Sequence, residues 1–230
     1  ALARADAVTC VSRSLQDYIG KSCRGHKPVV TIESTINPDD FYPMDKHTAR
    51  RALGLDIHAT YIGTAGALFA NRGIGTVYAA FLRLLKARPD VKLLLAGALD
   101  PGLPPPDHDN VIYLGDRPHA DMKDFYNALD IAFNYMNDDD FGRYSFPQKA
   151  YEMLACRIPV LSARVGVFAD LLAQDRFLYS PGDDNELQEK ILALLADPVV
   201  PVLRIPSWAE QAERMNAVIN GLFAPGIESA

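Results

Sequence analysis

Short apolar runs alternate with longer amphipathic stretches along most of the chain. The runs rich in β-branched and aliphatic residues predict seven strands, at 29–34, 60–66, 91–97, 111–116, 131–136, 158–163 and 176–180. Most of these runs are apolar at consecutive positions rather than alternating. That pattern is typical of parallel strands that helices cover on both faces.

Helical periodicity occupies much of the sequence between these runs, most clearly at 73–89 and 118–130. The apolar faces that this spacing predicts comprise Val77, Phe81, Leu84 and Leu85 in the first segment and Met122, Phe125, Tyr126 and Leu129 in the second. A regular succession of strand and helix predicts an α/β fold. We therefore expect a doubly wound, Rossmann-like parallel sheet of about six to seven strands flanked by helices.

Ligands of such sheets bind beyond the carboxyl ends of the strands, near the point where the strand order reverses. The segments expected at that edge are 66–73, 97–108, 115–120, 136–147 and 163–168. The Pro- and Asp-rich part of the second segment reads as a surface loop without chemistry.

A last helix is predicted at 206–223. Ser207 precedes its apolar positions, and Glu210 follows three residues later, which is the spacing of a capping box. We expect residues 224–230 beyond it to be frayed.

Composition and charge narrow the function classes. The 230 residues are 49% hydrophobic and 23% charged, as in ordinary globular domains. A net charge of -6 argues against nucleic acid as a partner, because that partner selects a strongly basic face. No apolar stretch approaches the roughly 18 to 20 residues of a membrane helix.

The candidate metal ligands are scattered. Cys10, Cys23 and Cys156 form no CxxC pair, and the five histidines are dispersed, so no metal site is predicted. Unpatterned cysteines suit a reducing cytosol, and we expect Cys156 to be packed in the core. The triplet at 138–140 fits D-x-D, but its position after a strand favours turn and N-cap roles over metal binding.

The chain begins at Ala1 without Met and shows no signal-peptide pattern. We expect the native N-terminus to be missing and the protein to be cytoplasmic.

Several segments resemble those of retaining GT-B glycosyltransferases of family four, in the same order along the chain. The family signature E-x-F-G-x-x-x-x-E-A-M-A-C-G-x-P-V is matched by FPQKAYEMLACRIPVLSA at 146–163, which retains Phe146, Glu152, Cys156 and Pro159 among others. Upstream, ADAVTCVS, INPDDFYP, IGTAGALFANRG and VIYLGDRPHADMKDFYNALD resemble further family elements, and downstream LYSPGDDNELQEKILALL and SWAEQAERM resemble its closing elements. The resemblance spans nearly the whole chain.

The resemblance implies the donor-binding half of a glycosyltransferase that uses a nucleoside diphosphate sugar, with retention and without metal or other cofactor. It also implies an acceptor-binding N-terminal domain that is missing here. Any contact with the inner face of the membrane is expected only through that N-terminal domain. The expected division is 1–28 as a remnant of that domain or a hinge, 29–205 as the nucleotide-sugar-binding domain and 206–223 as a crossing helix. The nucleotide-sugar-binding residues that it implies are Gly66, Arg72, Arg117, Tyr144, Ser145, Phe146, Lys149 and Glu152, while catalytic residues stay unassigned.

Two of these positions have a direct physical reading. Glu152 lies on a predicted helix at the ligand edge, where a carboxylate can accept hydrogen bonds from both ribose hydroxyls. Arg72 precedes a predicted helix N-terminus, and the two together can hold a diphosphate. The alternatives are a solvated, ion-paired glutamate and a surface arginine.

The departures of the chain from the family pattern include the following three. Tyr144 replaces a carboxylate that contacts the donor sugar, Ala67 replaces a phosphate-binding arginine, and Arg157 replaces a glycine. Lys149 belongs to a P-x-K-x-x-E pattern found in some branches, and we hypothesise that it supplies the cation lost at Ala67. The alternative is an intrahelical ion pair between Lys149 and Glu152.

Two other functions stay open at this point. Tyr144 and Ala67 favour a non-catalytic, glycosyltransferase-like scaffold subunit, and a nucleotide-sugar epimerase could share the architecture. A NAD-dependent oxidoreductase is disfavoured, because no G-x-G-x-x-G follows the first strand.

Overall fold

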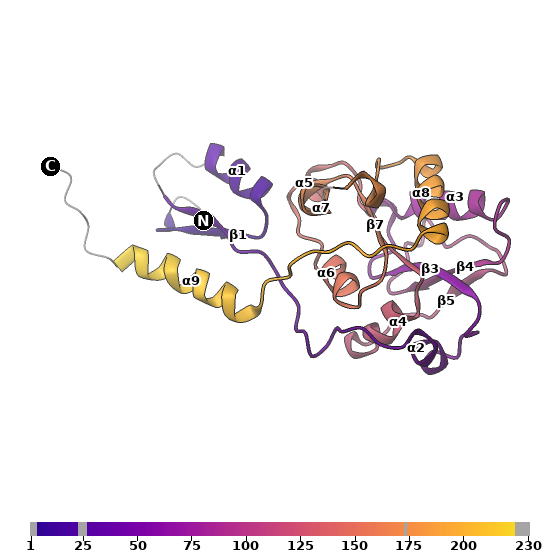
Figure 1. Ribbon diagram of the computed structural model, residues 1–230. Helices are drawn as coiled ribbons and strands as arrows, with labels where there is room; N and C mark the ends of the chain where they lie inside the picture. The colour runs from indigo at the N-terminus through magenta and orange to yellow at the C-terminus, as the bar shows by residue number, and fades with distance from the viewer. Residues whose placement is uncertain (1–3, 23–26, 173, 224–230) are drawn as a thin grey trace.

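The computed structural model describes residues 4–22, 27–172 and 174–223, and its centre is a six-stranded parallel sheet (Figure 1). The strands lie in the order β5-β4-β3-β6-β7-β8. Their bounds are β3 (Thr60–Ala65), β4 (Val91–Ala96), β5 (Val111–Tyr113), β6 (Ile131–Asn134), β7 (Val160–Ala163) and β8 (Leu178–Tyr179). The predicted fold class is confirmed. Because the order reverses between β3 and β6, the switch point lies beyond their carboxyl ends.

Helices cover both faces of this sheet. On one side α2 (Lys46–Ala52) packs against α4 (Met122–Ala128), and on the other α3 (Ile74–Leu84) packs against α8 (Asp184–Ala196) (Figure 1). Shorter helices follow the strands at the carboxyl edge. These are α5 (Asp140–Tyr144), α6 (Gln148–Ala155), α7 (Gly166–Leu172) and the 3-10 turns η2 (Ala70–Arg72) and η3 (His119–Asp121). A further 3-10 turn, η4 (Asp175–Phe177), leads directly into the amino end of β8.

The predicted apolar faces form the core. Val77, Phe81 and Leu84 of α3 are fully buried, and Leu85 is partly buried against the same core. The predicted face of the second helix is buried as well, at Met122, Phe125, Tyr126 and Leu129. Each such side chain contributes about 1.5–3 kcal/mol to the free energy of unfolding.

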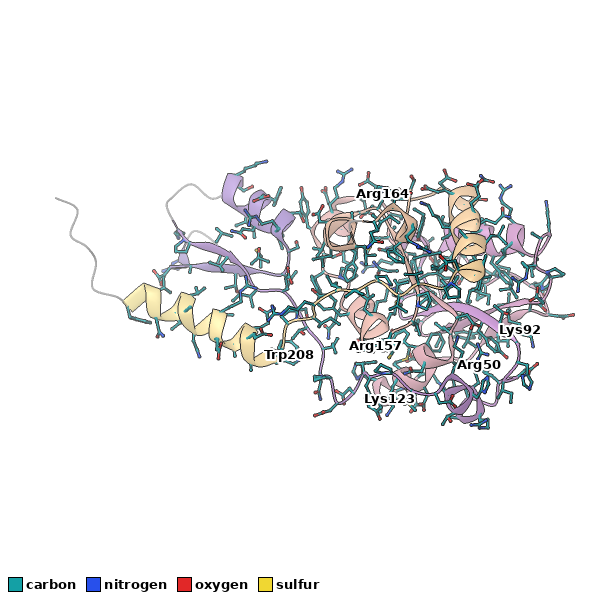
Figure 2. The ribbon with its side chains drawn as sticks, in the orientation of Figure 1. Arg50, Lys92, Lys123, Arg157, Arg164 and Trp208 are labelled. Atoms are coloured by element: carbon teal, nitrogen blue, oxygen red, sulfur yellow. The ribbon has the colours of Figure 1, made fainter. Side chains whose placement is uncertain are left out.

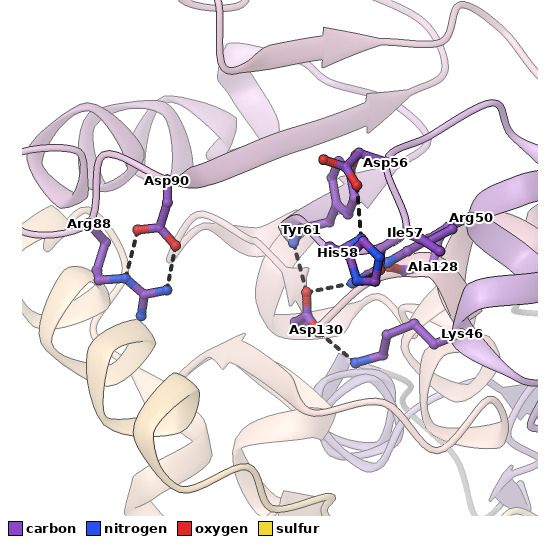
Figure 3. Close-up of polar contacts among 10 residues, drawn as sticks. All are labelled: Lys46, Arg50, Asp56, Ile57, His58, Tyr61, Arg88, Asp90, Ala128 and Asp130. Carbon is purple, nitrogen blue, oxygen red and sulfur yellow. Dashed lines mark hydrogen bonds and ion pairs between the residues drawn. The ribbon is translucent and has the colours of Figure 1, made fainter.

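A charged cluster around the buried Arg50 anchors α2 at the amino end of the sheet (Figure 3). The Arg50 guanidinium donates to the Asp130 carboxylate at 2.7 Å and to the carbonyls of Ala128 and Ile57 at 2.9 Å. The same carboxylate accepts from the Tyr61 backbone N–H and from the Lys46 ammonium. Because every charge in the cluster has a partner, the cluster is structural.

The N-terminal unit, comprising β1 (Val8–Cys10), α1 (Arg13–Ser22) and β2 (Val29–Thr31), lies outside the six-stranded sheet (Figure 1). β1 and β2 pair in parallel with Val8 opposite Val29. The prediction that 29–34 adds a strand to the main sheet is therefore wrong, and residues 29–31 pair with the N-terminal segment. β1 was not predicted, because three residues carry too little periodicity to mark a strand.

The final helix, α9 (Trp208–Phe223), returns to this unit. Its capping box is confirmed, since the Glu210 N–H donates to Ser207 Oγ at 3.1 Å and the Ser207 N–H donates to Glu210 Oε2 at 2.7 Å. Arg214 donates to the Thr31 carbonyl of β2 at 2.9 Å, and Trp208 is exposed at the start of the helix (Figure 2). The expected fraying of 224–230 and the thiol of Cys23 lie outside the described residues.

None of the helices within the described ranges is both long enough and apolar enough to cross a membrane.

Candidate functional site

Two adjoining cavities of about 240 Å³ each lie beyond the carboxyl ends of β3 and β6. The Arg72 cavity is lined by Ala67, Arg72, Tyr135, Met136, Phe141, Ser145, Phe146, Pro147, Gln148 and Lys149. The Glu152 cavity is lined by Ala65, Gly66, Ala96, Gly97, Asp116, Arg117, His119, Met122, Tyr126, Lys149 and Glu152. Lys149 lines both, so the two cavities share a wall. Seven of the eight predicted site residues are thus brought together at the switch point.

Lys149 points from the first turn of α6 toward the end of β3. Its Nζ lies 3.8 Å from the centroid of the Tyr135 ring and 3.5 Å from the Ala65 carbonyl oxygen. The Lys149 ammonium therefore faces Tyr135 and Ala65 and does not form the alternative ion pair with Glu152. Burial lowers the pKa of the Lys149 ammonium to about 7, with Arg72 lowering it further and Glu152 acting in the opposite direction. An anionic ligand would therefore meet an amine that gains its proton near neutral pH.

Glu152 is buried on α6, with 8% of its surface exposed, so it is not a solvated helix glutamate. Its Oε2 accepts a hydrogen bond from the Tyr126 hydroxyl at 3.1 Å, and His119 Nε2 lies 3.6 Å from Oε1. Burial raises the pKa of the Glu152 carboxyl, and these two neighbours oppose that rise. The carboxylate keeps acceptor capacity inside the cavity, which suits a ligand that offers hydroxyl donors.

Arg72 ends η2, directly before Gly73 and the N-terminus of α3. Its guanidinium carbon lies 3.4 Å from the centroid of the Phe141 ring. No ion pair is recorded for Arg72 among the residues that the structure describes, so its charge is available to a ligand. A cation beside a helix N-terminus is a favourable setting for an anion.

Two buried polar atoms at the cavity walls have no hydrogen-bond partner within the described part of the chain. They are Arg117 Nε, in the Glu152 cavity, and Ser145 Oγ, in the Arg72 cavity. An unpaired buried donor costs about 1–3 kcal/mol, so a polar ligand that satisfied both would gain affinity.

Tyr144 is the predicted site residue that lines neither cavity. Its ring packs against Tyr18 of α1 with centroids 5.0 Å apart, and its carbonyl accepts a hydrogen bond from Ser12 Oγ at 2.7 Å. The side chain that stands where the family has a sugar-binding carboxylate thus contacts the N-terminal unit.

The Asp triplet makes local contacts. Asp139 caps α5 by accepting from the Gly142 N–H at 2.8 Å, and Asp138 pairs with Arg143 at 2.8 Å, as turn and cap residues do. Across the described ranges no group of three or more His, Cys, Asp or Glu is arranged to hold a metal ion. Cys156 is packed in the core as predicted, and burial raises the pKa of its thiol to about 12.

Four side chains that contact Arg72, Lys149 or Glu152 were not predicted, namely His119, Tyr126, Tyr135 and Phe141. His119 and Phe141 fall in the segments 115–120 and 136–147 that were expected at the ligand edge, so position was their available signal. Tyr126 was assigned to the apolar face of a helix, and its hydroxyl contact with Glu152 spans elements far apart in sequence.

Comparison with known proteins gives the family. Residues 59–197 match the family described as Glycosyl transferases group 1. D-inositol 3-phosphate glycosyltransferase of Segniliparus rotundus is 30% identical over 171 residues, covering 69% of this chain and 37% of the relative. Lipopolysaccharide core biosynthesis mannosyltransferase LpsB of Rhizobium meliloti is 28% identical over 182 residues, covering 74% and 48%. The chain thus spans less than half the length of these curated relatives.

Solved structures share the fold. Sucrose-phosphate synthase from Thermosynechococcus elongatus aligns over 97% of this chain and 60% of its own, with a TM-score of 0.77 and 23% identity. The C-terminal domain of the group 1 protein LpcC from Francisella tularensis aligns over 70% of this chain and 88% of its own, with a TM-score of 0.58 and 20% identity. HepE of Anabaena, solved with UDP-glucose, aligns over 96% and 64%, with a TM-score of 0.70 and 19% identity. The chain belongs to the group 1 glycosyltransferases of the GT-B fold.

Proposed function

We propose that this chain is the donor-binding half of a glycosyltransferase that transfers a sugar from a nucleoside diphosphate sugar, with retention and without a metal ion. The observation that carries the proposal is the convergence of Arg72, Lys149 and Glu152 on two adjoining cavities at the switch point of the sheet. Two cations and one buried carboxylate are the groups that a diphosphate and a ribose need.

In the proposed complex the diphosphate lies between Arg72 and Lys149, on the shared wall of the cavities. Glycosyl transfer leaves negative charge on the departing diphosphate, and in the absence of a metal these cations stabilise it. Glu152 accepts hydrogen bonds from the ribose hydroxyls, and Arg117 Nε and Ser145 Oγ find ligand partners there.

The names of relatives support this ligand class. HepE of Anabaena was solved with UDP and with UDP-glucose, and the curated relatives are named as sugar-transferring enzymes.

We propose that the acceptor and part of the catalytic surface come from an N-terminal domain, so the chain alone binds the donor without transferring it. In this proposal residues 1–28 belong to that domain or to its hinge, and residues 29–205 form the nucleotide-sugar-binding domain. Residues 206–223 form a helix that crosses back to the N-terminal domain. The protein acts in the cytoplasm, and any membrane contact occurs through the missing half.

A non-catalytic relative is the second candidate, favoured by Ala67 and Tyr144. Lys149 argues for an adapted enzyme instead, because its Nζ lies beside the Ala65 carbonyl, two residues from Ala67. An epimerase of the same architecture draws no support from the site.

A thermal-shift panel of UDP-, GDP-, ADP- and CDP-sugars tests the proposal. One of them, at 100 times its dissociation constant, should raise the free energy of unfolding by about 2.7 kcal/mol. The same shift is expected after adding a chelator. A crystal structure that placed the nucleotide away from Arg72 and Glu152, or the absence of any shift, would refute the proposal. Hydrolysis or transfer by the full-length protein separates the enzyme from the scaffold.

A further inference from the structure

Helix α5 lies between the N-terminal unit and the Arg72 cavity. Contacts join it to α1 on one side and to α7 on another. The segment that runs on from it, Ser145 to Pro147, forms part of the wall of the Arg72 cavity. One short element therefore connects two parts of the molecule that share no sheet.

The N-terminal unit contacts the last two residues of α5, Arg143 and Tyr144. Ser12 Oγ donates to the Tyr144 carbonyl at 2.7 Å, and Ser14 Oγ donates to the Arg143 carbonyl at 2.5 Å. The Tyr18 ring packs on the Tyr144 ring with centroids 5.0 Å apart. The two hydrogen bonds pair carbonyls that would otherwise be unpaired at the helix C-terminus, since the last turn has no intrahelical donors for them.

On the cavity side α5 carries Phe141, whose ring lies under the Arg72 guanidinium. The interaction of a guanidinium with an aromatic face fixes the plane of the cation. The position of α5 therefore sets the position of the charge proposed to meet the diphosphate.

Close packing through Asn137 joins α5 to the segment 70–73. A Cβ at Gly142 would lie 2.1 Å from the Asn137 carbonyl oxygen, and one at Gly73 would lie 2.8 Å from Asn137 Oδ1. Asn137 Nδ2 in turn donates to the Ala70 carbonyl at 3.3 Å. With no space between these segments, a displacement of one must be passed to the other.

We propose that α5 transmits the position of the N-terminal unit to the Arg72 cavity, and that Tyr144 is the positioning residue through which α1 acts. In this role Tyr144 serves the donor site without touching the donor. The part of the inference that concerns nucleotide affinity rests on the proposed function, whereas the mechanical coupling does not.

Hydrogen exchange on the 230-residue chain without ligand tests the coupling. Tyr18→Ala removes the ring contact, and Tyr18→Phe keeps it and is the matched control. The Tyr18 side chain is about half exposed, so the fold should survive. Tyr18→Ala should speed amide exchange in both 141–146 and 70–73 by about threefold or more, with 111–121 unchanged. Faster exchange confined to 141–146, or no change in either segment, would overturn the proposal.

Calorimetry supplies a second readout, with the nucleoside diphosphate selected from UDP, GDP, ADP and CDP and with its bare nucleoside. Tyr18→Ala should weaken diphosphate binding by about threefold or more and leave nucleoside binding unchanged, and Tyr18→Phe should match the wild type. Equal losses for both ligands would contradict a coupling through Arg72. If the wild-type chain binds no diphosphate, the proposed function fails, and the exchange experiment still decides the coupling. Should Tyr18→Ala unfold the chain, Ser14→Ala replaces it in both measurements. That variant removes the hydrogen bonds that join Ser14 Oγ to the Arg143 carbonyl and to Ser12 Oγ.

Discussion

The Arg72 guanidinium lies over the Phe141 ring, 3.4 Å from its centroid, and so the orientation of a cavity cation depends on an aromatic side chain from another element. Phe141→Ala should weaken nucleoside diphosphate binding by about twofold to fivefold, the value of a partly exposed cation–π contact. Phe141→Tyr keeps an aromatic face and should bind like the wild type. Calorimetry with the diphosphate measures both, and a loss in Phe141→Tyr equal to that in Phe141→Ala would show that the ring face is irrelevant.

Lys149 and Glu152 should respond differently to ligands with and without phosphate. Lys149→Ala should cost about 1.5–3 kcal/mol of diphosphate affinity, the range for a charged hydrogen bond, and leave nucleoside binding nearly unchanged. Glu152→Gln should weaken both ligands, because both carry the ribose. Calorimetry of both ligands with both variants gives four values. Equal losses of nucleoside and diphosphate in Lys149→Ala would contradict the compensation hypothesis and favour the non-catalytic relative.

The pH dependence of donor binding should report the Lys149 ammonium. Burial lowers its pKa to about 7, so the free protein loses this charge as the pH rises through that value. A bound diphosphate favours the charged form, and the affinity should therefore fall from about pH 7 upward, by up to about tenfold per pH unit. A nucleotide sugar is the suitable ligand, because its diphosphate has no ionisation near neutral pH. Lys149→Arg keeps its charge throughout and should show a flat profile over pH 7 to 9.

Arg157 adopts a left-handed backbone conformation, with φ 55°, directly after the end of α6 (Figure 2). The family pattern has glycine here, which adopts this conformation without steric cost. Arg157→Gly should therefore raise the free energy of unfolding by about 0.5–1 kcal/mol, after allowing for the greater entropy of the unfolded chain. Arg157→Ala, which removes the charge but keeps the strain, should give no gain. Denaturant unfolding measures both, and equal stabilisation by the two variants would point to charge instead of backbone strain.

The sequence predicted the fold where a residue's own neighbours determine its environment. The strands of the main sheet are apolar on both faces, and Val77, Phe81 and Leu84 recur at helical spacing, so burial could be inferred locally. The Ser207–Glu210 capping box depends on a separation of three residues, and it was predicted for the same reason. Strand β1 was not predicted, because three residues are too few to show a strand pattern and its pairing with β2 does not appear in the local sequence.

Site geometry was predicted less completely, because side-chain direction depends on distant partners. The sequence places Lys149 and Glu152 one helical turn apart and so left an ion pair between them as the alternative. In the structure Lys149 turns instead to Tyr135 and Ala65 at the cavity wall. The Tyr144 ring similarly packs against Tyr18, and only the folded structure brings these two distant residues together. Periodicity identifies the edge of the sheet that holds the site, and tertiary contacts determine which side chains face it.

The tight backbone contacts around Asn137 also limit how this corner of the molecule can diversify. Gly142 lies against the Asn137 carbonyl, and Gly166 would bring a Cβ within 2.5 Å of the Gly142 carbonyl oxygen. The backbone therefore leaves no volume for a side chain at Gly142 or Gly166, and a single substitution at either position cannot be accommodated by repacking its neighbours. Among descendants of this sequence, variation should accumulate at the exposed positions 138, 140 and 143, where a new side chain can extend into solvent, while the packed positions change together or stay glycine.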